Sequence, residues 1–86
     1  MTTATLRTKA TLECMLAAAN DRHRAAQGYI AEVDAIMARA TSLESARQMV
    51  QFAMIEYRAR LGNAERAYQA RNAEIDATQF ADESDN

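Results

Sequence analysis

The sequence contains no proline and only two glycines, the residues that most often interrupt helices and mark tight turns. It is also poor in the side chains that strands favour, since aromatic residues make up 6% of its 86 positions. Alanine, the strongest helix former, occurs twenty times. This composition predicts a single all-α domain, small enough that its own hydrophobic core is thin.

Cysteine, histidine and long apolar runs are equally scarce. The single cysteine, Cys14, cannot form an intrachain disulfide, which suits a reducing compartment. No apolar stretch approaches the ~20 residues needed to span a membrane, so we expect a cytoplasmic protein with no membrane association. The one histidine, His23, lies about 13 Å from Cys14 along a helix, too far for a nucleophile–base pair.

Motifs for catalysis and cofactor binding are missing as well. The sequence has no Gly-rich phosphate loop, no Gly-x-Ser-x-Gly and no Glu-x-x-His pair of the kind that binds two iron ions in helical bundles. Zinc needs three or four protein ligands, more than one histidine and one cysteine supply. We therefore predict that the protein is not an enzyme and binds no metal or cofactor. The net charge of −2 argues against a nucleic-acid partner.

What the sequence does contain is two long helical patterns that differ in phase. In the first, the spacing alternates between four and three residues, which predicts one face of a helix. This first seam comprises Leu12, Leu16, Ala19, His23, Ala26, Ile30, Val33, Met37 and Ala40. The second seam comprises Leu43, Ala46, Val50, Met54, Tyr57, Leu61, Ala64, Tyr68, Arg71 and Ile75. One straight helix cannot hold both seams on one side, so the first helix must end and a second must begin between them.

The break is predicted at a capping box, Thr41-Ser42-Leu43-Glu44, in which either Thr41 or Ser42 caps the second helix. We expect one helical-hairpin domain over residues 1–80, with helices at about 5–39 and 43–77 joined by a turn at 40–43. Gly62-Asn63 is a weak point that could divide the second helix and give three helices. Residues 81–86 form an acidic segment that is expected to be disordered.

Large apolar side chains also lie off the two seams. Met15, Ala18, Ala25, Tyr29 and Ile36 flank the first seam, while Phe52 and Ile55 point nearly opposite the second and Met49 lies to its side. Burying each large side chain is worth about 1.5–3 kcal/mol, so leaving several in water is unfavourable. We therefore predict a homo-oligomeric helical bundle, with a dimer favoured. The expected oligomer interface consists of Tyr29, Ile36, Met49, Phe52 and Ile55.

Four arginines are predicted to gather at the middle of the hairpin. Antiparallel pairing places Arg22 and Arg24 level with Arg58 and Arg60, beside His23. This arginine belt is either a solvated surface balanced by nearby acids or a contact site for an acidic protein surface or an RNA backbone.

These features favour a non-enzymatic interaction protein that binds another protein as an adaptor, chaperone or inhibitor. The size and the lack of motifs are typical of small bacterial and phage accessory proteins. The alternative is an RNA-binding hairpin dimer that uses the arginine belt, against which the charge balance argues.

Overall fold

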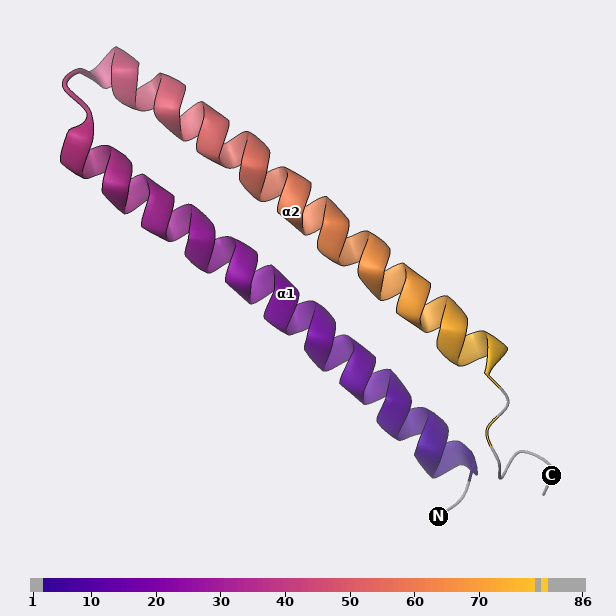
Figure 1. The fold of residues 1–86 in the computed structure, drawn as a ribbon. Coiled ribbons are helices and arrows are strands. Elements are labelled where there is room, and N and C mark those ends of the chain that lie inside the picture. The colour runs from indigo at the N-terminus through magenta and orange to yellow at the C-terminus, as the bar shows by residue number, and fades with distance from the viewer. Residues whose placement is uncertain (1–2, 79, 81–86) are drawn as a thin grey trace.

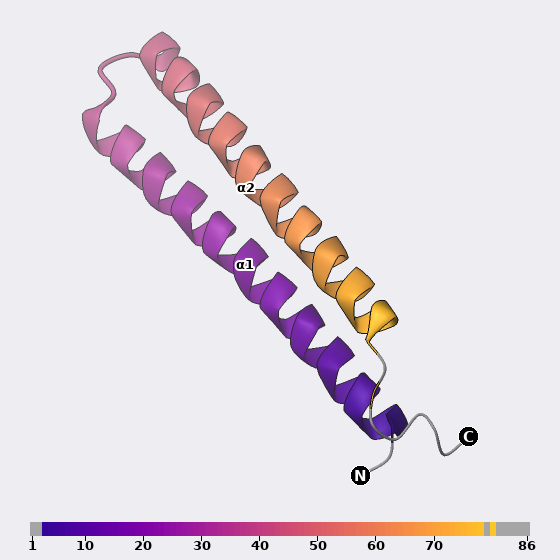
Figure 2. The same ribbon diagram turned by 45° about the vertical axis from the view of Figure 1, so that its right-hand side comes forward.

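Two long helices lie side by side and antiparallel in the computed structural model, which describes residues 3–78 and 80 (Figures 1 and 2). Helix α1 spans Thr3–Arg39 and helix α2 spans Leu43–Ala77. The hairpin measures 66 × 18 × 10 Å, so it is long and only one helix thick. The all-α fold class and the antiparallel hairpin are thus confirmed. The acidic segment 81–86 lies outside the described residues.

The turn between the helices is closed by Ser42. Its backbone is extended (φ −150°, ψ 162°), and its hydroxyl oxygen accepts a hydrogen bond from the Ser45 amide at 3.1 Å. The cap is therefore Ser42, the second of the two residues considered for it. Glu44 lies in the first turn of α2, where its charge stabilises the positive end of the helix dipole.

Helix α2 runs without a break through Gly62 and Asn63, so the three-helix alternative is wrong. The side chain of Asn63 accepts a hydrogen bond from Arg66 one turn later and therefore supports the helix at its weak point. At the C-terminal end, the Thr78 amide donates to the Glu74 carbonyl at 2.8 Å, which satisfies part of the last turn.

The packed face of α2 agrees with the seam read from the sequence. Ala64 is buried, and the half-buried residues include Ala46, Val50, Met54, Tyr57, Leu61, Tyr68 and Ile75. Two members of the predicted seam, Leu43 and Arg71, are exposed.

The packed face of α1 differs from the prediction. The residues buried against α2 are Cys14, Ala18, Ala25 and Ile36, whereas the predicted seam residues Leu12, Leu16, Ile30 and Met37 are exposed. The observed face precedes the predicted one by about one residue, which is a rotation of about 100° around the helix. Small side chains explain the choice, because Ala18 and Ala25 allow close packing against α2.

Aromatic stacking holds the rotated face in place. The rings of Tyr29 and Tyr57 stack across the helix pair, with centroids 5.1 Å apart and planes 20° from parallel. Such pairs contribute about 0.5–1.5 kcal/mol beyond the area they bury. Nearer the termini, Cys14 Sγ lies 3.9 Å from the Tyr68 carbonyl oxygen and 3.7 Å from Asn72 Oδ1.

The open end of the hairpin is held by Arg7. Its guanidinium donates to the carbonyls of Ile75 at 3.2 Å and Thr78 at 3.3 Å, and its Cζ lies 5.0 Å from the centroid of the Phe80 ring. These bonds connect α1 to carbonyls at the end of α2, of which the Ile75 carbonyl also accepts from the Thr78 amide at 3.2 Å. Arg7 therefore fixes the register of the two helices at the end opposite the turn.

The core that results is small. Among the described residues, the buried hydrophobic side chains are Cys14, Ile36 and four alanines, Ala18, Ala25, Ala53 and Ala64. Only Ile36 among them is large and fully buried. Because the stabilisation from burial scales with apolar area, these fully buried side chains contribute little for a chain of this length. None of the helices in the described part is long and apolar enough to cross a membrane.

Candidate interaction surfaces

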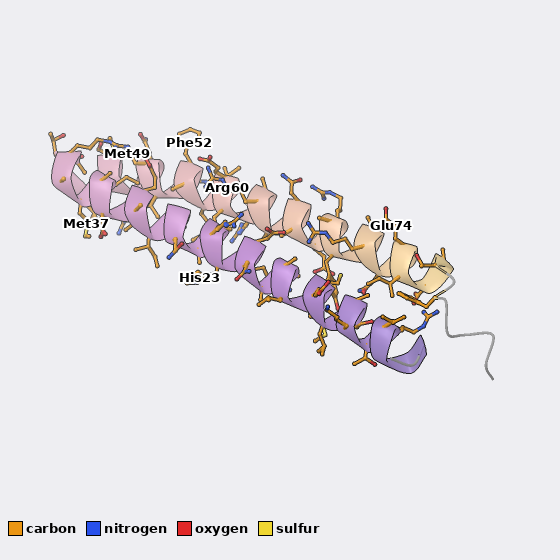
Figure 3. All side chains as sticks on the ribbon, turned by 60° about the horizontal axis from the view of Figure 1, so that its bottom comes forward. His23, Met37, Met49, Phe52, Arg60 and Glu74 are labelled. Atoms are coloured by element: carbon orange, nitrogen blue, oxygen red, sulfur yellow. The ribbon has the colours of Figure 1, made fainter. Side chains whose placement is uncertain are left out.

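A long exposed apolar surface runs along the outer side of α1. Leu12, Leu16, Ile30 and Met37 are between 58% and 70% exposed, and they alternate with small residues and His23 at heptad spacing. We call Leu12, Leu16, Ala19, His23, Ala26, Ile30, Val33 and Met37 the outer stripe. Figure 3 shows His23 and Met37 extending from the edge of α1 that faces away from α2. The rotation of α1 leaves this stripe, predicted as the seam, largely in solvent.

An open apolar groove lies at the turn end of the hairpin. It has a volume of about 420 Å³ and is lined by Leu43, Ala46, Arg47, Val50, Gln51 and Met54. These residues lie at intervals of three and four and therefore form one side of α2. Leu43 is exposed at the start of this groove, and Val50 and Met54 are half-buried. The groove gives the beginning of α2 an apolar side of its own.

A second, shorter apolar surface lies on the back of α2. Phe52 is 73% exposed and Ile55 is 57% exposed, and we call these two residues the α2 patch. Figure 3 shows Phe52 extending from α2 on the side away from α1. Met49, one turn before, is half-buried. The ion pair between Glu56 and Arg60, with 2.7 Å between Oε1 and Nη2, begins one turn after Phe52.

Two residues expected at an oligomer interface lie inside the hairpin. Ile36 is 1% exposed, and Tyr29 is half-buried in its stack with Tyr57. The expectation that they lie off the intrachain seam is wrong, because the rotation of α1 turns both toward α2. The structure thus divides the residues predicted for the oligomer interface: Phe52 and Ile55 are exposed on the surface of the hairpin, and Ile36 is buried between its helices.

The four arginines of the belt lie on different sides of the hairpin. Arg24 and Arg60 line one shallow pocket of about 310 Å³ together with Asp21 and Asn63. Arg22 and Arg58 are exposed and do not line it. Residues two positions apart on a helix point about 200° apart, so neighbouring belt residues on each helix diverge. The hairpin brings only one arginine of each helix to this surface, and one acidic side chain, Asp21, accompanies them.

Acidic partners reduce the positive charge of that surface further. Arg60 pairs with Glu56, and Arg71 Nη1 lies 3.9 Å from Asp21 Oδ2. Gly28 leaves room for the Arg60 side chain to lie across α1, since a Cβ built on Gly28 would be 2.6 Å from Arg60 Nη1. The surface around Arg24 and Arg60 is therefore a network of mixed charge between the helices.

The side chains that could act in catalysis or bind a metal, His23 and Cys14, lie apart from each other. His23 is exposed on the outer stripe, although the sequence placed it in the packed seam. Cys14 is buried as a free thiol against α2. Over residues 3–78 and 80, no group of three or more His, Cys, Asp and Glu side chains is placed to hold a metal ion.

The chain matches no family model, and comparison with curated proteins and with solved structures likewise finds no similar protein.

Proposed function

We propose that the protein is a non-enzymatic interaction module that binds another protein as an adaptor, chaperone or inhibitor. The observation that carries the proposal is the α2 patch, in which Phe52, the most exposed large hydrophobic residue of the described part, stands beside Ile55 on the back of α2. The patch lies opposite the face that packs on α1, so the hairpin itself cannot cover it. The proposed partner presents an apolar pocket or the apolar face of a helix.

The composition of the patch supports this role. Interface energy is concentrated in a few anchor residues at the centre, among which aromatic side chains are enriched. Full burial of Phe52 and Ile55 is worth about 1.5–3 kcal/mol each. The neighbouring Glu56–Arg60 pair would remain at the rim, where exposed charges contribute orientation more than affinity. A small apolar centre with a charged border is thus the surface proposed for the partner.

The test compares three immobilised proteins in an extract of the cells that produce this chain. They are the wild type, the double variant Phe52→Ser/Ile55→Ser, and a control, Arg22→Ser/Arg58→Ser, which removes two exposed side chains elsewhere. Bound proteins are quantified by mass spectrometry, and far-UV circular dichroism verifies that all three baits are equally helical.

We expect a protein that the wild type and the arginine control retain equally and that the patch variant retains at least tenfold less, about 1.4 kcal/mol. Equal capture by the wild type and the patch variant would contradict the assignment of the site. A loss confined to the arginine control would instead identify the belt as the contact surface. Capture of no protein above the blank resin would count against the interaction module as a whole.

A further inference from the structure

The outer stripe of α1 has the spacing of a coiled-coil seam. Its residues follow one another at intervals that alternate between four and three from Leu12 to Met37, which is an unbroken heptad pattern. Within the hairpin no described segment packs over this side, and Leu12, Leu16, Ile30 and Met37 remain mostly exposed. Knobs-into-holes packing against another helix is the arrangement that such a pattern fits.

The stripe is complementary to its own reversed copy. When two α1 helices run antiparallel about an axis between Arg24 and Ala25, Ala19 lies opposite the partner's Ile30. His23 then lies opposite the partner's Ala26. Each bulky side chain near the centre thus meets a small one, which is what close packing requires.

A parallel arrangement lacks this match. It would place Ala19 on the partner's Ala19 and Ala26 on the partner's Ala26, leaving gaps, and would bring His23 against the partner's His23. Toward the ends, the antiparallel arrangement pairs Leu12 with the partner's Met37. Reversal therefore fills the small positions near the centre and places bulky pairs only toward the two ends, whereas parallel alignment alternates gaps with crowding.

The size of the stripe is sufficient for a dimer. It is about 38 Å long, and a helix with its side chains is about 10–12 Å wide, so a second helix covers roughly 400 Å² of each copy in projection. Two copies together hide roughly 800 Å² in projection, and the corrugation of the side chains raises the accessible area lost. The contact therefore reaches the ~1,000 Å² of a specific interface.

We infer that the outer stripe is the dimer interface of this protein and that its occupant is the outer stripe of a second copy, packed antiparallel about a two-fold axis near Arg24 and Ala25. The contact is isologous, so each residue makes the same contacts in both subunits. The four helices are ordered α2, α1, α1 and α2 across the dimer. This inference concerns a different surface from the α2 patch and does not depend on it.

The first experiment measures mass by analytical ultracentrifugation. We expect a wild-type particle of twice the 9.5 kDa chain mass. Ile30→Glu should raise the dissociation constant of the dimer at least tenfold, since a charge replaces an apolar knob. The control Ala31→Glu places the same charge about 100° around the helix, away from the stripe, and should leave the dimer intact. A monomeric wild type, or a dimer equally unaffected by both substitutions, would overturn the inference.

The second experiment tests the direction of packing by disulfide cross-linking. Two single-cysteine chains, Ala19→Cys and Ile30→Cys, are made on a Cys14→Ala background. Mild oxidation of the two chains mixed together should give a disulfide-linked dimer, while each chain oxidised alone should remain mostly unlinked. Efficient linking of either chain with itself would indicate parallel packing and overturn the proposed interface.

Discussion

The packed face of α1 can be tested by the same substitution at two isoleucines, Ile36→Ala and Ile30→Ala. Ile36 is 1% exposed, whereas Ile30 is 61% exposed. Truncating a buried isoleucine to alanine costs about 2–5 kcal/mol, from which the better helix propensity of alanine recovers a few tenths. Ile36 lies in the last helical turn of α1, next to the loop between the helices. The loop can move partly into the cavity that the truncated side chain leaves. We therefore expect a loss of about 2–3 kcal/mol, or roughly 10–20 °C in Tm.

For Ile30→Ala the expected loss within the hairpin is below about 0.5 kcal/mol, because most of the side chain already contacts solvent. The assay is thermal and urea unfolding followed by circular dichroism, at protein concentrations about a hundredfold apart. Ile36→Ala should destabilise the fold at both concentrations, and Ile30→Ala should do so mainly where the dimer is populated. Equal losses at low concentration, or a neutral Ile36→Ala, would refute the packing of α1 on its alanine-rich side.

The remaining predictions concern the backbone of the two helices. Gly62→Ala should stabilise the fold by about 0.5–1 kcal/mol, since alanine favours the helix and the new Cβ meets only ordinary contacts at 3.5 Å or more. Gly28→Ala should stabilise the fold less, because the new Cβ displaces the end of the Arg60 side chain. Urea denaturation compares the stability of the two variants, and a larger gain at Gly28 would contradict the placement of Arg60. Ser42→Ala should cost about 1 kcal/mol and Thr41→Ala much less, and the opposite order of urea midpoints would move the cap back to Thr41.

The hairpin was predictable because its signals are local. Absence of proline, the phase change near residue 41 and the capping residues each determine structure within a few turns. The limits of α2 at Leu43 and Ala77 follow from the cap and from the weakening of the periodic pattern. The choice between Thr41 and Ser42 was open at that level, since both are good caps one residue apart.

The face of α1 that packs on α2 was not predictable from periodicity. Heptad spacing identifies a side of a helix that another helix covers, but it does not say whether that helix belongs to the same chain. On α1 two neighbouring sides are apolar, one bulky and one small, and the rule that large apolar residues are buried favours the bulky side. The structure buries the small side, with Ala18 and Ala25 at its centre. A signal was present in Tyr29 and Tyr57, which fall nearly level in the antiparallel register and stack.

The distribution of side-chain size around α1 connects the fold with both proposed surfaces. Small residues against α2 give a thin hairpin whose internal contacts bury mostly alanine. The large residues on the outer side would be a liability in an isolated chain, because exposed apolar stripes promote non-specific association. A self-complementary stripe resolves this conflict, since a second copy covers it in one register and closes the assembly at two subunits. In that dimer the α2 helices occupy the outer positions, and each α2 patch remains open to a partner.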